Sequence, residues 1–385
     1  MRRVRLKEIG TFYSGLSGKS KSDFSEGNAL LVTYRNIFNN PVLNPAIKDT
    51  VVVGKDEKQN EVLWGDILIT GSSETPADAG MSSVVLFNPQ EKMYLNSFCF
   101  GFRLNDMNEA LPSYIGHLLR STSIRAAISK TAFGVTRFNV NRMRFADIEI
   151  PLPPLNIQKE IVSILDSFTS LIDKMKQEVE MRKKQMEYYR EKLMAPQKNW
   201  EIKTLGEIGT FTRGNGLQKS DFRVKGFPCV HYGQIHTYYN TCIYKTKSFC
   251  EEDLAKKLQK ASYGDLLIAT TSEDVKACCK AAVWFGAGDV AYSGDSFCYS
   301  HDQDPKYMAY LFQTEMFAKQ KQKAATGAKV IRVSGESMAS FSFAFPPLVQ
   351  QRQIASILDT FETYISKLEK MIELRQKQYE YYREK

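Results

Sequence analysis

The sequence predicts an α+β protein in which two β-rich domains are each followed by one long helix, the two helices pairing as a coiled coil. The first observation is an internal repeat in the 385-residue chain. Residues 8–12, Glu-Ile-Gly-Thr-Phe, return unchanged as residues 207–211, and residues 164–168 return as 357–361 with one change. The second observation is that each copy passes from short apolar runs to a long heptad pattern after Pro-Pro-Leu. A repeat this long indicates duplicated domains rather than a solenoid.

The repeat also sets the expected domain boundaries. We place the first domain at residues 1–154, its helix at 155–194, a linker at 195–200, the second domain at 201–347 and its helix at 348–385. The two helical segments are nearly copies, whereas the domain interiors share little sequence. This uneven similarity indicates a common frame that carries two lobes with different details.

Composition favours a globular protein with a polyanionic partner. Hydrophobic residues make up 43% and charged residues 25% of the chain, and 52 Lys and Arg exceed 43 Asp and Glu. Of the net charge of +9, residues 1–154 carry +3 (18 minus 15), residues 195–347, which include Lys198 of the linker, carry +4 (19 minus 15), and each helix carries +1. The basic excess therefore lies mainly on the domains, where it suits a polyanion without requiring one.

Cysteine usage and hydropathy exclude several protein classes. The seven cysteines show no regular Cys-x-x-Cys spacing, which argues against a disulfide framework and a zinc ribbon. The basic N-terminus lacks the apolar core of a signal peptide, and no apolar run approaches the ~20 residues of a membrane span. We expect a cytoplasmic protein without membrane contact.

Within each domain, β-branched and aromatic runs bounded by turn residues predict strands. In the first domain these runs are residues 51–53, 67–70, 84–87 and 98–102, and in the second they are 266–270, 281–285 and 296–299. A helix beginning at a proline is expected to follow in each domain, over residues 112–129 and 305–323.

The long helices carry two apolar seams at heptad spacing, sustained over four or more heptads, which indicates a coiled coil. Packing of each helix on its own domain is the alternative. Arg182 and Arg375 interrupt the same seam position in both copies. The expected seam and partner-binding residues are Leu155, Ile161, Leu165, Phe168, Ile172, Met175 and Val179 in the first helix, and Leu348, Ile354, Leu358, Phe361, Ile365, Leu368 and Ile372 in the second.

Three pairs of matching segments combine basic, amide and aromatic residues suited to nucleic acid. Residues 134–142 of the first copy align with residues 327–334 of the second. Residues 34–36 correspond to residues 231–236, and residues 18–22 correspond to residues 218–220. Arginine can bridge a guanine edge and asparagine an adenine edge, and both can hold phosphate. Ordinary solvated loops are the alternative, but their matching places in both copies favour a contact surface. The candidate DNA-binding residues are Lys19, Lys21, Arg35, Asn36, Thr136, Arg137, Asn139, Asn141, Arg142, Lys219, His231, Gln234, His236, Lys329 and Arg332.

We find no catalytic motif in the sequence. There is no Asn/Asp-Pro-Pro-aromatic motif of adenine methyltransferases and no phosphate-binding loop of an NTP motor. Asp265, Asp274 and Lys276 could imitate a metal-nuclease pattern, but the first copy has no such lysine after Asp66. The shared Gly-Asp is better interpreted as a turn entering a strand.

A metal site is also not expected. The one plausible cluster is Cys229, His231, His236, Cys242 and Cys250, since thiolate and imidazole bind zinc. Its spacing fits no standard zinc site, and the first copy lacks equivalent residues. Adjacent Cys278 and Cys279 are expected to be buried thiols.

One order of motifs, repeated over essentially the whole chain, resembles a known family. Residues 150–155 read Ile-Pro-Leu-Pro-Pro-Leu, residues 158–162 read Gln-Lys-Glu-Ile-Val, and Ile-Leu-Asp and a long helix ending in Tyr-Tyr-Arg follow. The second copy departs slightly, with Phe-Ala-Phe at 343–345 and Gln-Gln-Arg-Gln at 350–353. This pattern resembles the DNA-specificity subunit of type I restriction–modification enzymes.

The resemblance implies that each domain is a target-recognition domain that reads one half of a bipartite sequence in double-stranded DNA. It implies that the helices pair antiparallel and set the distance between the domains. Two methyltransferase subunits would dock on this frame to methylate an adenine in each half-site, and motor-nuclease subunits would join for restriction. S-adenosylmethionine, ATP and Mg²⁺ are then expected on the partner subunits and no cofactor on this chain, which would catalyse nothing.

The residues themselves leave a second class open, a scaffold that binds no DNA and carries two duplicated binding lobes on a coiled coil. Salt dependence separates the two classes, because phosphate-mediated binding weakens steeply as salt rises and an apolar protein interface does not.

Overall fold

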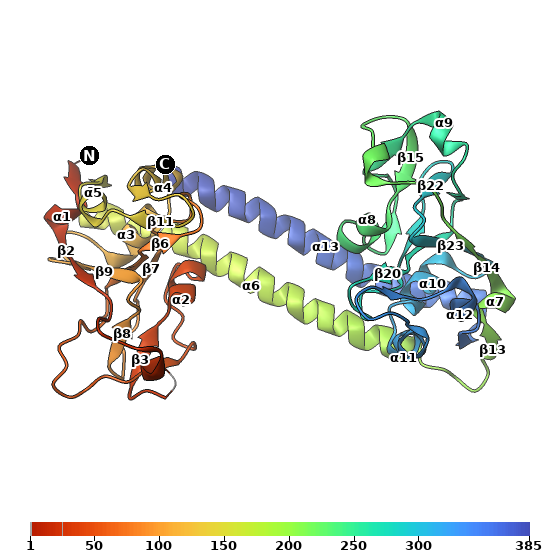
Figure 1. The fold of residues 1–385 in the computed structure, drawn as a ribbon, viewed down its shortest axis with the longest axis horizontal. Helices are drawn as coiled ribbons and strands as arrows, with labels where there is room; N and C mark the ends of the chain where they lie inside the picture. The colour runs from red at the N-terminus through yellow and green to blue at the C-terminus, as the bar shows by residue number, and fades with distance from the viewer. Residues whose placement is uncertain (1, 25) are drawn as a thin grey trace. The chain divides into compact units, whose positions relative to one another are not determined.

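The computed structural model describes residues 2–24 and 26–385 and confirms the α+β class (Figure 1). It divides into two compact units: residues up to Lys176 with Lys370–Lys385, and Gln177–Glu369. Each unit holds one β-rich lobe, here lobe 1 (residues 2–154) and lobe 2 (residues 201–347), and a part of each long helix. In the described part of the chain no helix is long and apolar enough to cross a membrane.

Lobe 1 is closed by its own two ends and built on three sheets. The end strands pair antiparallel: β1 (Arg2–Arg5) and β12 (Glu149–Leu152). The central antiparallel sheet has the order β2 (Gly10–Ser14), β9 (Cys99–Leu104), β5 (Ile67–Thr70) and β7 (Ser82–Val84). Two smaller sheets have the orders β4 (Asp49–Val51), β3 (Ala29–Val32), β8 (Met93–Leu95) and β10 (Ala132–Phe133), β11 (Phe138–Val140), β6 (Ser72–Ser73). Its shortest helices are α1 (Leu6–Ile9), α2 (Tyr34–Asn39), α5 (Arg142–Ala146) and the 3-10 helix η1 (Lys21–Phe24).

Lobe 2 repeats this plan with a wider central sheet. The end strands are β13 (Glu201–Thr204) and β25 (Ser342–Phe345). The central sheet has the order β14 (Gly209–Arg213), β23 (Ser296–His301), β19 (Leu266–Ala269), β21 (Lys280–Trp284) and β16 (Cys242–Ile243). One smaller sheet has the order β17 (Ser248–Cys250), β15 (Phe227–Val230), β22 (Val290–Tyr292) and β18 (Lys260–Ala261). The other consists of β20 (Thr271–Ser272) and β24 (Ile331–Arg332). Its short helices are α7 (Leu205–Ile208), α8 (Tyr232–Thr237), α9 (Glu252–Ala255), α12 (Gly335–Ala339) and the 3-10 helix η2 (Lys219–Asp221).

The central strands are buried on both faces: in lobe 1 one face of the sheet packs against α3 and α4, and the other against α2, β3 and β8. All four residues of β5 and all four of β19 are buried. Phe100 and Phe102 fill the core of lobe 1, and Trp284 and Tyr299 fill that of lobe 2. The seven strands expected from β-branched and aromatic runs are all present, with ends shifted by a few residues.

The helix expected in each lobe is wrong as a single element. Residues 112–129 form α3 (Pro112–Leu119) and α4 (Thr122–Ser129), and residues 305–323 form α10 (Pro305–Leu311) and most of α11 (Glu315–Ala324). Ser121 and Thr314 break the helices, because their side-chain oxygens accept from the backbone N–H of Ile124 and Phe317 and cap a new N-terminus.

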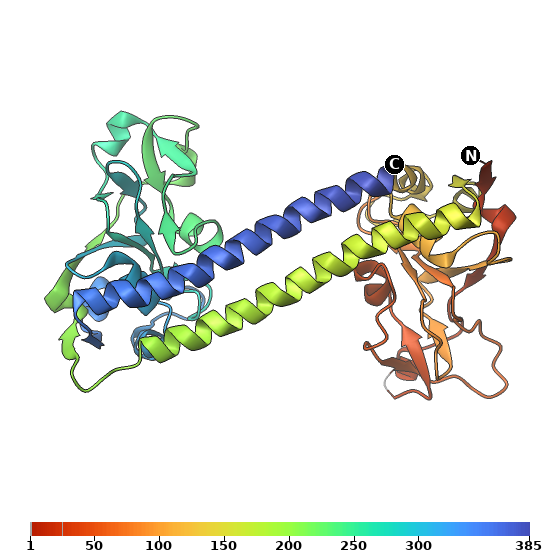
Figure 2. The ribbon, with the colours of Figure 1, turned by 180° about the vertical axis from the view of Figure 1, so that it is seen from behind.

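The long helices are α6 (Leu155–Leu193) and α13 (Leu348–Glu384), which contact one another inside each unit (Figure 2). In the first unit the rings of Phe168 and Tyr382 stack with centroids 5.5 Å apart. In the second unit Lys183 pairs with Glu369 at 2.9 Å, and Tyr189 stacks on Phe361. Within this unit the helices run antiparallel, since the partner's number falls as the residue number rises.

Most of the expected seam residues are buried or half-buried, but some of them pack on their own lobe: Ile354 and Leu358 belong to the core of lobe 2, and Ile161 packs against the core of lobe 1. Leu165, Ile172, Met175, Val179, Ile354, Leu358, Ile365 and Leu368 are buried, and Leu155, Ile161, Phe168, Phe361 and Ile372 are half-buried. Leu348 is exposed, which corrects its assignment to the seam. It is the first residue of α13 and lies one turn before Gln351, the first buried residue of that helix.

Each lobe also receives the end of a long helix. In the first unit the carboxylate of Glu384, at the end of α13, accepts from the backbone N–H of Thr122 and Ser123 at the start of α4. In the second unit Glu191, near the end of α6, accepts from the backbone N–H of Glu315 at the start of α11. The same contact therefore occurs in both copies, and in each the carboxylate satisfies free helix N–H groups.

Candidate nucleic-acid interface

A cavity of about 600 Å³ in lobe 1 is lined by two of the candidate residues, Thr136 and Arg137. Arg137 is fixed at its wall: its Nε donates to Ser72 Oγ at 3.0 Å, and its guanidinium carbon lies 5.1 Å from the centroid of the Phe98 ring. The lining comprises Tyr34, Phe38, Ser72, Ser73, Glu74, Thr75, Asp78, Asn96, Phe98, Thr136 and Arg137. Arginine, amide, carboxylate and aromatic groups thus converge on one hollow, as in sites that recognise the edge or face of a base.

Strand pairing brings these groups together from distant parts of the sequence. β11 pairs with β6 so that Asn139 lies opposite Ser72 and Phe138 opposite Ser73. The turn that leads into β11 needs Gly134, whose φ of +136° is open only to glycine and where a Cβ would lie 2.0 Å from the Arg137 carbonyl oxygen. The loop at residues 134–137 is therefore held at both ends.

Two other candidates near the cavity have structural roles. The buried Asn36 side chain donates to Asn44 O and accepts from Asn44 N, so it ties a loop to α2. Its neighbour Arg35 is exposed. Asn141 caps α5 by accepting from the backbone N–H of Arg144 at 3.1 Å. Both ends of the Asn36 amide are therefore bonded to the backbone of Asn44, and Asn141 uses its side-chain oxygen as a helix cap.

Among the other candidates of residues 134–142, Thr136, Asn139 and Arg142 are all exposed, but the Arg142 side chain is also bonded within the lobe. Arg142 donates to Ser14 Oγ at 2.8 Å and lies over the Phe100 ring, and burial lowers the pKa of its guanidinium. Arg142 therefore supports the sheet edge beneath the loop.

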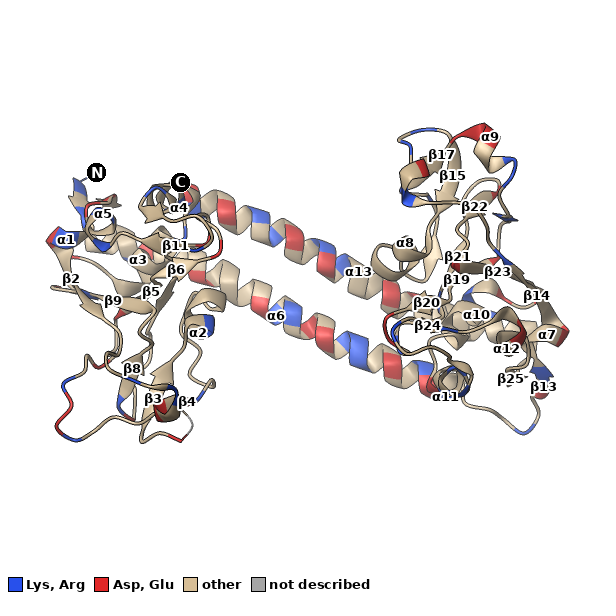
Figure 3. Ribbon diagram, viewed as in Figure 1, with Lys and Arg blue, Asp and Glu red and all other residues tan. Residues whose placement is uncertain are grey.

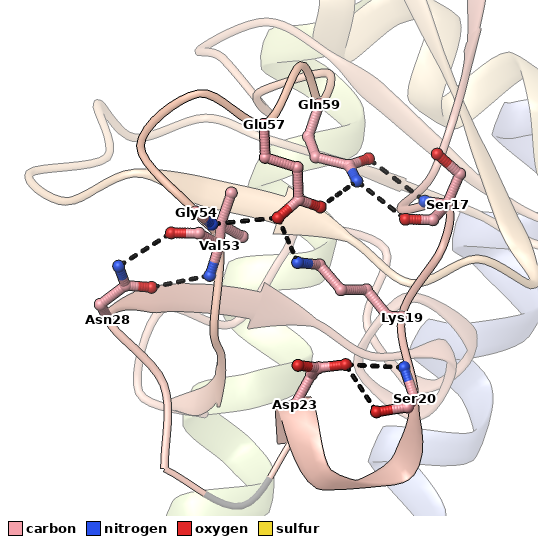
Figure 4. A network of polar contacts seen from close by, with 9 residues as sticks. All are labelled: Ser17, Lys19, Ser20, Asp23, Asn28, Val53, Gly54, Glu57 and Gln59. Atoms are coloured by element: carbon pink, nitrogen blue, oxygen red, sulfur yellow. Dashed lines mark hydrogen bonds and ion pairs between the residues drawn. The ribbon is translucent and has the colours of Figure 1, made fainter.

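Lys19 is likewise not the free phosphate donor that the sequence suggested (Figure 4). Its side chain is only 9% exposed and its ammonium pairs with Glu57, which also accepts from Gly54 N and from the amide of Gln59. Hydrogen bonds from Lys19, Gly54 and Gln59 lower the pKa of Glu57 to about 2. Lys21, two residues on, is exposed.

In lobe 2 the candidates of α8 are structural as well. His231 is buried and accepts at Nδ1 from Gly233 N, and burial lowers its pKa. Gln234 accepts from His231 N and donates to Ser248 Oγ, and His236 Nε2 lies 2.9 Å from Thr271 O. His231 and both ends of the Gln234 amide are therefore engaged within the lobe, whereas His236 is bonded at Nε2 alone. Their amide and imidazole groups are used to hold α8 against the neighbouring strands.

The remaining basic candidates of lobe 2 are exposed: Lys219, Lys329 and Arg332. In the register of β20 and β24, Arg332 lies opposite Thr271, as Asn139 lies opposite Ser72 in lobe 1. The two lobes thus present different side chains from the same backbone position.

Sequence reasoning missed exposed apolar residues beside the loop at residues 134–137. Phe98, 58% exposed, was expected inside a strand, but β9 begins only at Cys99 and Phe98 stands in the preceding turn. Phe133, Val135 and Met143 are also exposed around the loop. The signal that could have found Phe98 is the Asn96-Ser97 turn immediately before it.

The rejected catalytic and metal patterns have ordinary structural roles. Asp66 accepts from Leu63 N and Asp265 from Ser262 N, both at 2.8 Å, so the shared Gly-Asp is a turn entering a strand, as expected. Burial raises the pKa of the Cys229 thiol to about 12. Across residues 2–24 and 26–385, no group of three or more His, Cys, Asp or Glu side chains could hold a metal ion.

Comparison with known proteins gives the family. A family model described as the type I restriction modification DNA specificity domain matches residues 1–181 and again residues 197–376. The chain belongs to this family. The two matches coincide with the two copies of the repeat, so each copy is one specificity domain.

Named relatives agree with the family. A putative type I restriction enzyme specificity subunit of Haemophilus influenzae is 30% identical over 267 residues, covering 65% of this chain and 66% of the relative. The Escherichia coli EcoR124I/EcoR124II specificity subunit is 28% identical over 249 residues, 62% of each chain. The alignments thus span slightly less than two thirds of these relatives. The crystal structure of an S subunit from M. genitalium has the same fold, with a TM-score of 0.57 and 15% identity over 100% of this chain and 95% of the other.

Proposed function

We propose that this chain is the sequence-reading subunit of a type I restriction–modification complex and binds a bipartite target in double-stranded DNA, with one lobe for each half-site. The observation that carries the proposal is that two specificity domains of one fold present different side chains at matching positions. Asn139 in lobe 1 corresponds to Arg332 in lobe 2, and Arg137 corresponds to Val330. Different side chains on equal frames suit the reading of two different half-sites.

The long helices offer two matching surfaces for a pair of identical partner subunits. Charges of both signs occur along α6 and α13 (Figure 3), but apolar side chains are exposed between them at equivalent positions. These residues form two equivalent sets, one in each unit: Ile164, Leu171, Leu374 and Tyr381 in the first unit, and Ile357, Tyr364, Met181 and Tyr188 in the second. We propose that each set receives one methyltransferase subunit, and that motor-nuclease subunits join the complex for cleavage.

The chain itself is proposed to be non-catalytic. S-adenosylmethionine, ATP and Mg²⁺ would act on the partner subunits. Purified chain without partners should therefore neither methylate nor cut DNA, and methylation by the chain alone with S-adenosylmethionine would contradict this proposal.

The docking surface can be tested by charge insertion. Ile164→Glu with Ile357→Glu should abolish assembly with the cognate methyltransferase subunit in size-exclusion chromatography, because a carboxylate would be buried in an apolar contact. Ser163→Glu with Ser356→Glu is the matched control, since both serines are exposed and lie about 100° away around the helix. Equal assembly of both double variants would place the partner elsewhere.

DNA reading is tested separately by salt and by methylome sequencing. Affinity of the assembled complex for its DNA should fall steeply between about 50 and 200 mM salt if phosphates are contacted. Cells lacking this chain should lose one bipartite methylated motif. A complex that binds without salt dependence and leaves the methylome unchanged would favour the scaffold that binds no DNA.

A further inference from the structure

We infer that Arg137 reads a guanine in the half-site of lobe 1, and that lobe 2 has no equivalent reader. This inference rests on the proposed function and deepens it, because it assigns one base and one side chain.

The guanidinium of Arg137 is oriented with its outer edge unused. Nε donates to Ser72 Oγ, and Ser72 is itself buried in β6, so the inner edge is anchored to a fixed strand. Within residues 2–24 and 26–385, no acceptor takes a hydrogen bond from the two terminal nitrogens, Nη1 and Nη2. Two parallel N–H groups then face away from the anchor, which is the arrangement that pairs with O6 and N7 of guanine.

Phe98 restricts the plane of this group. The guanidinium lies over the exposed Phe98 ring, so the ring and Ser72 together oppose rotation of a side chain that is otherwise very flexible. Holding the side chain before DNA arrives reduces the rotamer entropy lost on binding. Phe98 is an exposed apolar side chain in a turn, and its contact with the Arg137 guanidinium is the role that we assign to it.

The other polar groups of the cavity favour a base edge over a phosphate. Glu74 and Asp78 line the same hollow as Arg137. Carboxylates repel phosphate oxygens, but they accept from the amino group of cytosine, the partner of guanine. An arginine flanked by carboxylates therefore suits a G·C pair better than the sugar-phosphate backbone.

Lobe 2 replaces the arginine, the ring beneath it and the serine that anchors it, and keeps the glutamate, since Glu273 matches Glu74. Leu68 pairs with Gly101 in lobe 1 and Leu267 with Cys298 in lobe 2, so counting back three residues aligns Phe98 with Asp295. Val330 stands at the position of Arg137. Thr271, the counterpart of Ser72, donates to Asp295 Oδ1 instead of holding an arginine. A guanidinium is therefore absent from this position in lobe 2, and a carboxylate takes the place of its supporting ring.

The test couples the side chain to a single atom of the DNA. The complex of the full chain with its methyltransferase subunits is titrated onto duplexes that carry its methylated motif, with each guanine replaced in turn by 7-deazaguanine, which lacks the N7 acceptor. Wild-type binding should weaken several-fold at one guanine of one half-site. Arg137→Ala should weaken binding to the unmodified duplex by about 5- to 150-fold and show no further loss at that same guanine.

Control variants distinguish base reading from phosphate contact. Arg144→Ala, an exposed arginine in the same lobe, should keep the full loss at that guanine. Phe98→Leu, which leaves Arg137 in place without its ring, should give a smaller loss at the same guanine. If Arg137→Ala weakens all duplexes equally and lowers the salt dependence, Arg137 contacts phosphate and the inference is wrong. It is equally wrong if the modification effects are unchanged in Arg137→Ala. If the wild-type complex prefers no DNA sequence, the proposed function fails instead.

Discussion

The buried carboxylate of Asp66 gives the sharpest prediction about stability, because the repeat supplies its own control. Asp66 Oδ1 accepts from Arg103 Nε at 2.7 Å, and Oδ2 accepts from Arg103 Nη2, Tyr13 OH and Leu63 N at 2.6–2.8 Å. In lobe 2 the corresponding Asp265 accepts from Ser262 N and from the weak thiol donor of Cys298. Tyr13 and Arg103 have no counterparts there, since Thr212 and Ser300 stand in their places.

We expect Asp66→Asn to lower the free energy of unfolding of lobe 1 by about 3 kcal/mol. Removing one partner of a buried ion pair costs about 3–5 kcal/mol, and the lower end applies because the Arg103 side chain is 37% exposed and can be rehydrated. The asparagine keeps the size of the carboxylate, so the loss comes from the unpaired guanidinium rather than from a cavity. Asp265→Asn should cost lobe 2 only about 1 kcal/mol, since its amide oxygen can still accept from Ser262 N.

Hydrogen exchange of the full chain measures both lobes in one experiment. Protection of the β5 amides should fall about 100-fold or more in Asp66→Asn while that of β19 stays unchanged, and β19 protection should fall about fivefold in Asp265→Asn. Equal losses in the two lobes would show that the Arg103 ion pair adds nothing to the turn that both aspartates make.

Three further predictions concern the helix ends, acid titration and modular reading. Glu384→Gln should reduce the amide protection of α4 alone, and Glu191→Gln should reduce that of α11 alone, each by about 1 kcal/mol. The reason is that each carboxylate interacts with the positive N-terminus of its helix. Changes spread over both lobes would contradict this. Glu57 has a pKa of about 2 against a usual 4.5, so its pairing stabilises the folded state above pH 4.5 and this contribution is lost as the pH falls through 2. Lys19→Met should raise that pKa, as measured by the carboxyl ¹³C shift, whereas Lys21→Met should not. Exchange of residues 201–343 for those of a relative should change one half of the methylated motif, and a change in both halves would exclude independent reading.

The frame could be predicted from sequence because its signals are local and repeated. Pro153 and Pro154 end one strand and start α6 at Leu155, and Pro346 and Pro347 do the same before Leu348. The heptads that follow leave little choice except a long helix. Ser121 and Thr314 were missed as breaks because the apolar pattern continues across them, and only capping by their side chains ends the preceding helix.

The candidate interface was harder to predict, because the sequence does not show which polar groups are already paired. Lys19, Asn36 and His231 have suitable chemistry, but partners distant in sequence or their own backbone take up their hydrogen bonds. Arg137 has the same local signal and keeps a free edge, since its anchor Ser72 lies 65 residues away and engages only Nε. The difference depends on strand pairing, which a single sequence does not specify.

One position shows how two lobes keep one backbone while their sequences diverge, and it gives a last prediction. Gly80 has a φ of +69° two residues before β7 begins at Ser82, and the corresponding residue of lobe 2 is Cys279, with a φ of +61°. A Cβ on Gly80 would lie 2.6 Å from Cγ2 of Ile128, the branching methyl group. In lobe 2 the residue at the place of Ile128 is Lys321, which has no branch at Cβ and extends to donate to Lys276 O and Cys278 O.

Gly80→Ala should therefore destabilise lobe 1 through both backbone strain and the contact with Ile128. The strain of a left-handed residue costs about 1–2 kcal/mol, and the overpacked contact adds about 1–3 kcal/mol. Ile128→Met removes the branched methyl group at similar side-chain volume. Added to Gly80→Ala, it should remove the cost of the overpacked contact and leave the backbone strain. The double variant should therefore be more stable than Gly80→Ala alone. Urea unfolding, monitored by hydrogen exchange of the β7 amides, measures the interaction free energy between positions 80 and 128. If the two effects simply add, the glycine is required by backbone conformation alone, and lobe 2 tolerates a cysteine for a reason other than the unbranched lysine beside it.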